Sequence, residues 1–417
     1  MQFAKNLILG FIFFICFSSV ISGDQFHYLD IHVGERASGL AGAFSAISDD
    51  PSGAFYNPAG LAFTNKSYFS VSTNTFSYSK STYFDVFKDA ENENNNWESD
   101  AASFIPNYFG LLQDYEDFKI AFSFIIPEGN EFNQDNLIDL QYATTSNNKE
   151  YLRNYNEKTF LYLLGPSVAF EINDSWSVGG SLFLSRRTRD FIDNQRVVWG
   201  NQANKWEWSN LNSEAFSWGT LGVLGLQYMP SSALSFGLTI RDSKDFIAEA
   251  NQQSLSASAN GTVRGQGEFD LLALGYKSVP ASITSGMAYF FSPYLLWTAD
   301  VHFYPAHKAS NVQFSRKSLL NFATGIEYYA SINLPIRFGL YTNNSTLNEF
   351  SQGAFDVDML GLTFALGYET EFSSLSLGID YSFGRGQIAI PDADKNLQFL
   401  NSEMQNFHVF FSGSYMI

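Results

Sequence analysis

The sequence predicts an all-β fold, a 14-stranded antiparallel transmembrane β-barrel with an N-terminal hatch, or plug, in its lumen. Three observations support this prediction. Apolar and polar residues alternate with period two, short and long connections alternate along the chain, and the N-terminus has the features of a secretory signal. Of the 417 residues, 45% are hydrophobic and 17% aromatic, which excludes a disordered chain. The net charge of −18 argues against a nucleic-acid partner.

Residues 1–23 are expected to form a signal peptide that is removed. Lys5 supplies a positive charge, an apolar run follows over 7–17, and the residues up to 23 are mostly small. A lipoprotein signal at Cys16 is the alternative, but its neighbours in sequence are bulky. Cys16 is the single cysteine, so no disulfide is expected in the mature chain. Together with a barrel, this signal predicts the outer membrane of a Gram-negative type of cell.

Residues 24–67 are expected to form the hatch. They lack the alternation and contain many glycines and prolines among small apolar residues, a composition that favours tight, irregular packing. The glycines and prolines of this segment are Gly34, Gly39, Gly42, Pro51, Gly53, Pro58 and Gly60.

Residues 68–417 are expected to form the barrel. The alternation is clearest in 119–126, 234–241 and 375–384. After the signal, no apolar run is long enough for a membrane helix, but a barrel crosses a membrane without one. A soluble β-sandwich or β-helix is the alternative, because alternation does not show whether the apolar face meets lipid or another sheet. Aromatic residues at strand ends favour lipid, as in an interfacial girdle: Trp176, Tyr228, Tyr368 and Tyr381.

The connections predict the number of strands. Short turns are expected near 113–117, 173–175, 230–233, 291–294, 330–334 and 371–374. Long polar stretches are expected near 80–101, 128–157, 190–214, 243–267, 305–317, 343–356 and 385–405. These joints divide the chain into fourteen strands, and short turns that alternate with long loops are typical of outer-membrane barrels. A strand-like stretch at 268–279 would break the even number. It is interpreted either as part of one strand bent at Pro280 or as an ordered part of the fourth external loop.

The hatch segment resembles that of the FadL family of outer-membrane transporters. The likeness rests on residues 34–43, on 48–54 and on the Asn-Pro-Ala-Gly step that follows, and it continues along most of the mature chain. The hatch motif residues are Gly34, Gly39, Gly42, Asn57, Pro58, Ala59 and Gly60. One departure is the C-terminus, where Tyr415 is the third-last residue although barrel proteins commonly end in an aromatic residue.

The resemblance implies a 14-stranded barrel that takes up hydrophobic compounds passively, expected here to be long-chain fatty acids, without catalysis. In the family the hatch shifts and the compound leaves through the barrel wall at a kink in the third strand. Here that strand is expected over 118–127, and Pro127 and Gly129 are the candidates for the kink because both weaken strand pairing. A strand that simply ends at its loop is the alternative interpretation.

Arg187 and Arg189 are the candidate substrate-binding residues. If the apolar face of 176–189 meets lipid, both point into the lumen near its external end, where a guanidinium can hold a carboxylate with two hydrogen bonds. Arg241 and Arg337 turn inward by the same argument. The alternative role for the pair is neutralisation by acids of the hatch or lumen: Glu171, Asp300, Glu327 or Asp380.

Neither an enzyme nor a cofactor or metal site is expected. Residues 384–389 match a dinucleotide fingerprint but lack the βαβ setting, and Asp300 with His302 offers too few ligands for a metal. The acidic stretch 85–100 is expected to be a solvated loop, with ion-bridged contact to lipopolysaccharide as the alternative. The expected partners are hydrophobic small molecules, outer-membrane lipid and lipopolysaccharide, and the expected state is a monomer. The alternative functions are a non-transporting barrel of this type that serves surface-protein secretion and, third, an outer-membrane hydrolase.

Overall fold

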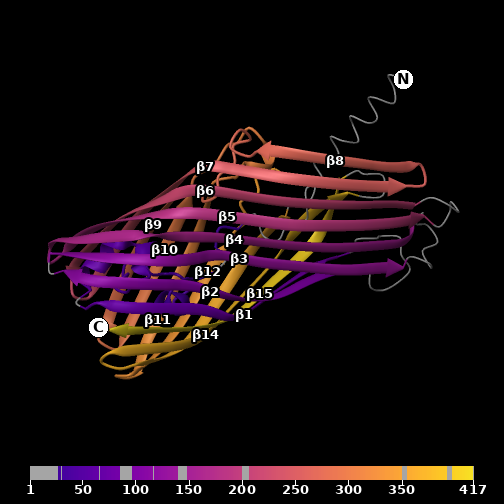
Figure 1. Cartoon of the computed structure of the whole chain (residues 1–417). Coiled ribbons are helices and arrows are strands. Elements are labelled where there is room, and N and C mark those ends of the chain that lie inside the picture. Colours follow the sequence, from indigo (N-terminus) through magenta and orange to yellow (C-terminus); the bar gives the residue numbers. More distant parts are fainter. Residues whose placement is uncertain are drawn as a thin grey trace.

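The computed structural model describes residues 27–29, 31–64, 66–84, 96–115, 117–139, 148–199, 206–349, 355–391 and 397–416. The signal peptide expected over 1–23 and most of the acidic stretch 85–100 lie outside these residues. The strands form one antiparallel sheet that closes on itself as a barrel (Figure 1).

In the described part of the chain, fourteen strands make up the closed wall, as predicted. β1 pairs with β15, and β6 pairs with β7, which closes the ring. The wall strands are β1 (Tyr68–Tyr83), β2 (Trp97–Tyr115), β3 (Phe118–Asp139), β4 (Asn148–Asn173), β5 (Trp176–Trp199), β6 (Trp206–Ser231), β7 (Leu234–Ser258), β9 (Ser282–Ser292), β10 (Leu295–Tyr304), β11 (Leu319–Ser331), β12 (Leu334–Asn343), β13 (Phe355–Glu369), β14 (Ser373–Pro391) and β15 (Leu397–Met416).

The fifteenth strand, β8 (Gly261–Asp270), is not part of the wall. Its partner is the far half of β7, and the two form a hairpin that extends beyond the rim of the barrel (Figure 1). The near part of β7, from Leu234 to Arg241, pairs with β9 instead. Residues 268–279 are therefore an ordered part of an external loop, and the interpretation of 268–290 as one bent strand is wrong.

The side chains alternate between the two faces of the wall as predicted. On β14, Leu377 is 56% exposed on the outer face, whereas Asp380 on the inner face is 4% exposed. The alternating segment 119–126 departs from the prediction at its end, because Ile126 is buried instead of facing lipid. The cause is a bulge in the pairing of β3 with β4 between Ile125 and Glu128, which changes the side of the sheet to which the following residues point.

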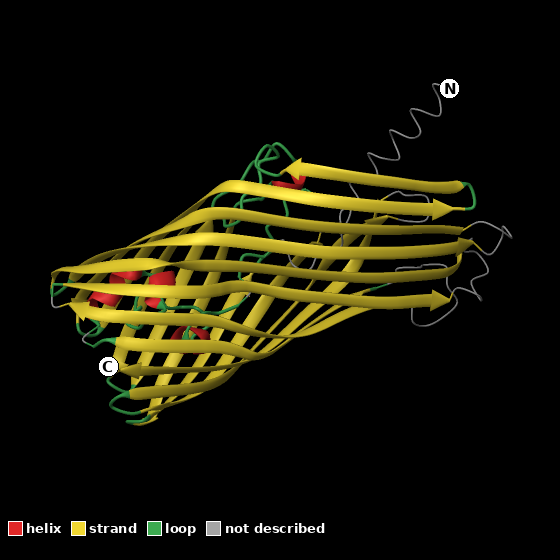
Figure 2. Cartoon of the chain, in the orientation of Figure 1, coloured by secondary structure: helices red, strands yellow, loops and turns green. Residues whose placement is uncertain are grey.

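All six short turns lie where they were expected, but the long polar stretches are mostly strand rather than loop. β3 continues to Asp139, so the interpretation of a third strand that ends at Pro127 is wrong. The backbone of such a polar stretch still pairs with its neighbours, and outside the hydrocarbon layer neither face of a strand has to be apolar. The strands therefore extend well beyond one end of the barrel (Figure 2).

The N-terminal segment, residues 31–64, is enclosed by the wall. It contains α2 (Glu35–Gly39), α3 (Gly53–Tyr56) and the 3-10 helix η1 (Pro58–Phe63), which lie near the short-turn end of the barrel (Figure 2). Another 3-10 turn, η2 (Val312–Phe314), lies between β10 and β11. None of the described helices is long and apolar enough to cross a membrane. Most apolar residues of the segment form a buried cluster with inner-face residues of the wall, such as Leu163 of β4 and Phe183 of β5.

Candidate functional site

The middle of the N-terminal segment is fixed to the wall by buried hydrogen bonds. The carboxylate of Asp300 on β10 accepts from the backbone N–H groups of Phe44 and Ser45, at 3.1 and 2.9 Å. The Asn57 side chain donates to the carbonyl of Ser45 at 2.7 Å and to that of Leu226 on β6 at 3.2 Å, and it accepts from the N–H at the start of η1. Moving this part of the segment away from the wall would leave buried donors and acceptors without partners, which costs free energy.

The residues of the hatch motif take positions that only small side chains allow. Gly34 and Gly42 have positive φ angles of 87° and 74°, which favour glycine. Gly39 lies against Arg337, where a Cβ would come within 2.9 Å of that side chain. The Asn57-Pro58-Ala59 step rests on glycines of β5 and β6, and Gly60 lies against the carbonyl of Ser48.

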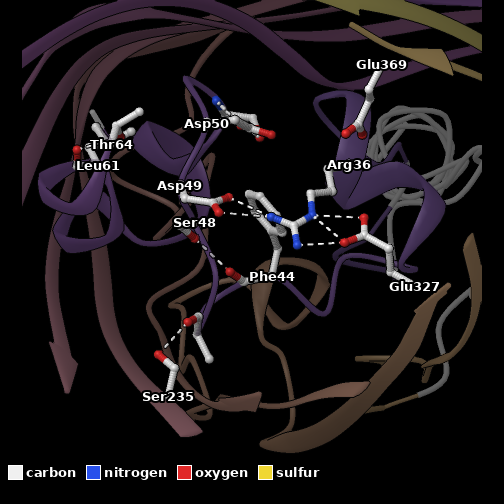
Figure 3. Close-up of polar contacts among 12 residues, drawn as sticks. Arg36, Phe44, Ser48, Asp49, Asp50, Leu61, Thr64, Ser235, Glu327 and Glu369 are labelled. Atoms are coloured by element: carbon white, nitrogen blue, oxygen red, sulfur yellow. Dashed lines mark hydrogen bonds and ion pairs between the residues drawn. The ribbon is translucent and has the colours of Figure 1, made fainter. Parts of the chain in front are cut away.

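A charged network connects α2 to the wall at the short-turn end (Figure 3). Arg36 donates to Asp49 at 2.8 Å and to Glu327 on β11 at 2.7 Å. Glu327 also accepts from Arg337, whose other end bonds to Glu369 at 2.7 Å. These residues line a cavity of about 370 Å³.

Burial and charge shift the pKa values of the segment's own ionisable groups at this end. Burial lowers the pKa of the Arg36 guanidinium, but Asp49 and Glu327 outweigh it, so this pKa lies well above its ordinary value. Burial raises the pKa of Glu35 despite the nearby Arg337, and it raises the pKa of Asp50 to about 6. Arg36 is therefore a permanent cation that ties α2 to β11.

The wall beside the N-terminal segment contains a stretch in which β2 and β3 do not pair. Tyr108 pairs with Ile125, and Asp100 pairs with Asn133, but among the described residues no pair joins the seven residues of each strand between these points. The register is the same on both sides, so the strands separate locally without an inserted residue. Seven strand residues span about 23 Å. We call residues 101–107 and 126–132 the unpaired wall.

Pro127 and Gly129 both lie in the unpaired wall. Pro127 lies within the bulge between Ile125 and Glu128, next to the point where β3 loses both neighbours. Proline has no N–H to donate to a ladder. Gly129 lies against Ile105 of β2, since a Cβ there would come within 2.8 Å of the isoleucine Cδ1 atom.

The unpaired wall is closed from inside by the start of the N-terminal segment. The N–H of Ile31 donates to the carbonyl of Pro127 at 3.3 Å. The Ile31 side chain is buried in a cluster with Ile105 and Ile126, against which the residues Phe124, Phe160 and Tyr162 pack. One residue further along, the carbonyl of His32 accepts from Asn107 of β2 at 2.8 Å. Packed side chains and two hydrogen bonds of the N-terminal segment, not pairing of β2 with β3, therefore close this part of the barrel.

Arg187 and Arg189 point into the lumen, and each contacts a carboxylate. Arg187 bonds to Glu128 and, at 2.8 Å, to the carbonyl of Ser278, while Arg189 donates to Glu157 at 2.6 Å. None of the four acids considered from the sequence is the partner. The bulge at Pro127 turns the Glu128 side chain into the lumen. The sequence analysis missed this partner because the position of a bulge can be found only from the register of β3 on β4.

Of the four arginines expected to face the lumen, Arg241 on β7 has no carboxylate partner among the described residues. Its guanidinium lies over the ring of Phe55, 4.4 Å from the centroid, and donates to the carbonyl of that residue. Its Nε atom is buried with no hydrogen-bond partner in the described structure. Its cross-strand neighbours on β6 and β9 are Val223 and Ser282, and neither carries a charge. Which residues lie beside Arg241 depends on the strand register, and the sequence alone does not provide that register.

The comparisons with known proteins identify the family. A family model described as outer membrane protein transport protein (OMPP1/FadL/TodX) matches residues 22–293. The chain belongs to this family. The family consists of outer-membrane transporters and channels for hydrophobic small molecules, not of enzymes.

Solved structures of the family share the fold of this chain. The toluene transporter TodX of Pseudomonas putida has a TM-score of 0.64 at 14% identity, over 93% of this chain and 99% of that one. A FadL homologue of Pseudomonas aeruginosa has a TM-score of 0.62 at 13% identity, with the same coverage. The toluene transporter TbuX of Ralstonia pickettii has a TM-score of 0.62 at 12% identity, over 92% and 98% of the two chains. No curated protein sequence matches the chain.

Proposed function

We propose that the protein is a passive outer-membrane channel for hydrophobic compounds, with long-chain fatty acids as its main substrates. In this proposal residues 24–67 are a hatch, residues 68–417 are the barrel, and the compound leaves sideways into the membrane through the unpaired wall. The observation that carries the proposal is that no pairing of β2 with β3 closes this stretch, which is covered instead by apolar side chains with Ile31 of the hatch among them. Opening it breaks no ladder hydrogen bond between β2 and β3. It costs apolar contacts, which lipid or substrate can replace, and the two hydrogen bonds of Ile31 and His32 to the wall.

The charges of the lumen support an anionic substrate. A fatty acid that bound to Arg187 or Arg189 would have to compete with Glu128 or Glu157. Arg241 requires no such displacement, and an unpaired guanidinium in an apolar surrounding binds a carboxylate strongly. We therefore assign the deep carboxylate site to Arg241 and keep Arg187 and Arg189 as residues that an anion meets first, nearer the external end.

Neutral aromatic compounds are the other substrate class that the relatives suggest. TodX and TbuX are toluene transporters, and CymD is a monoaromatic hydrocarbon channel. The cluster at the unpaired wall contains phenylalanine and tyrosine, which accept aromatic rings as readily as acyl chains. The protein functions as a monomer surrounded by outer-membrane lipid and lipopolysaccharide in this proposal, since every contact that the route requires lies within one chain.

Crosslinking of the unpaired wall tests the lateral exit. Cysteines at Ile105 and Gly129 face each other across it, and a short, reducible bifunctional thiol reagent would join β2 to β3. The matched control is a pair at Phe109 and Phe124, which already face each other in the ladder. We expect crosslinking of the first pair to lower fatty-acid uptake into proteoliposomes at least tenfold, with recovery after reduction, and the control pair to have no effect. Equal uptake by both crosslinked pairs would exclude exit at this place.

A further inference from the structure

The hatch is attached to the wall along its whole length, but by different contacts in its two parts. Residues 35–64 are held by the charged network of Arg36 and by buried bonds to wall residues such as Asp300, Ser181 and Thr239. The described residues before Gly34, which are 27–29 and 31–33 and which we call the strap, contain no helix. Nε2 of His27 lies 2.6 Å from the carbonyl of Val357 on β13, and the carbonyl of Leu29 accepts from Asn343 on β12 at 2.5 Å. Gly34 joins the two parts with a φ of 87°. The strap is the part that contains Ile31, so whatever fixes the strap keeps the unpaired wall closed.

His32 of the strap bonds to a carboxylate of the wall. Nδ1 of His32 lies 2.9 Å from Oδ2 of Asp380 on β14, and the two side chains are 3% and 6% exposed. The carboxylate also accepts from the Tyr341 hydroxyl of β12 at 2.9 Å, and the tyrosine ring meets the imidazole edge-on at 4.8 Å. Because a carboxylate only accepts, the imidazole donates from Nδ1.

The imidazole has no second polar contact that could replace this bond. Its Nε2 atom is buried and has no hydrogen-bond partner among the described residues. Gly42 of the hatch leaves the space for the ring, since a Cβ at that position would lie 2.9 Å from the imidazole Cδ2 atom. The ring is therefore oriented by one bond to β14 and by its packing.

We propose that His32 and Asp380 form the latch of the strap: their hydrogen bond holds the strap across the lumen and keeps Ile31 in the unpaired wall. His32 connects the two sides directly, because its side chain bonds to β14 while its carbonyl accepts from Asn107 beside the unpaired wall. Both are positioning residues that act through Ile31 and contact no substrate. The inference rests on the proposed lateral exit for its functional meaning, but the closed strap can be tested without any substrate.

The test measures how often Ile31 is released. An Ile31→Cys variant of the full chain in proteoliposomes is labelled with N-ethylmaleimide, and the rate is compared with and without changes in the latch. His32→Ala and Asp380→Leu each remove the hydrogen bond between the imidazole and the carboxylate, so we expect labelling to become about tenfold faster. The double variant should be no faster than either single variant, because both changes remove the same bond. A heat-modifiable gel shift shows that each variant retains its barrel.

Two amide replacements of His32 distinguish loss of the latch bond from a general loosening of the hatch. His32→Asn places an N–H close to the position of Nδ1 and should restore slow labelling, whereas the longer His32→Gln should label as fast as His32→Ala. Ser181→Ala, which removes a bond to Ala54 in the fixed part of the hatch, should not change the rate. The latch is refuted if labelling is unchanged in His32→Ala and Asp380→Leu, or if His32→Asn and His32→Gln label at the same rate. If labelling responds as expected but the crosslinked wall still passes fatty acid, the lateral exit is wrong and the latch stands.

Discussion

At the scale of single residues, the charges of the lumen are mostly used to hold the structure together. Arg36, Arg187 and Arg337 each bond to a carboxylate, and Arg36 and Arg337 share Glu327, so removal of both of these would leave a buried acid without its cations. Arg241 is different, because it contacts a ring and a carbonyl instead of an acid. A buried cation with spare hydrogen-bonding capacity is costly unless a ligand uses it.

Replacement of Arg241 should separate acids from esters. In Arg241→Gln we expect binding of a long-chain fatty acid to weaken about tenfold, because a charge-assisted bond to the carboxylate is lost. Binding of the corresponding methyl ester should be unchanged. Titration calorimetry of the detergent-solubilised protein measures both, and Arg264→Gln, on the exposed strand β8, is the matched control. An equal loss for acid and ester would show that Arg241 does not bind the carboxylate.

Asp50 should make the stability of the protein depend on pH. Burial raises the pKa of Asp50 to about 6, although hydrogen bonds from Ser52 lower it, whereas an unfolded aspartate titrates near pH ~4. Between these values the folded chain binds more protons than the unfolded chain, so the contribution of this group to stability falls as pH rises from about 4 to about 6. Asp50→Asn keeps an acceptor for Ser52 and removes the titration. Its urea midpoint should therefore vary less over this range and exceed that of the wild type at pH ~7; parallel curves would contradict the assignment.

At the scale of elements, the sequence predicted the features that depend on the alternation of apolar and polar residues. It did not predict the features that depend on how neighbouring strands are aligned. The outward faces of β7 and β14 and every short turn were predicted, because each depends on neighbouring residues alone. The bulge at Pro127 and the inward turn of Glu128 were not, because both depend on how β3 is aligned with β4. The partners of Arg187 and Arg189 were missed for the same reason, and so was the isolation of Arg241.

Removal of the strap should open the unpaired wall and leave the rest of the hatch in place. Deletion of residues 24–33, with the signal retained, removes Ile31 and His32 but none of the bonds that residues 35–64 make to the wall. We expect a folded, heat-modifiable barrel with a small increase in ion conductance across planar bilayers. Deletion of 24–64 should instead give a far larger conductance, because the lumen itself is then empty. Equal conductance of the two deletions would mean that the strap supports the whole hatch.

At the scale of the whole molecule, two routes of release can be compared. The proposed route passes through the unpaired wall into lipid, and the alternative would follow the lumen to the charged cavity at the short-turn end, which Arg36, Glu327 and Arg337 line. Transfer of a hydrophobic compound into lipid lowers its free energy, because apolar surface leaves water. On the second route the compound would have to displace water from the charged side chains of the cavity, which raises the free energy. The arrangement of apolar and charged side chains therefore favours sideways release.

A photoreactive fatty acid distinguishes these routes most directly. A chain with a diazirine near its methyl end would be bound in proteoliposomes, illuminated, and its sites of attachment mapped by mass spectrometry. Lateral exit predicts adducts on Ile31, Ile105 and Phe124 at the unpaired wall, and their loss when Ile105→Cys and Gly129→Cys are crosslinked. Adducts confined to the residues of the charged cavity, such as Tyr68 and Tyr329, would contradict it.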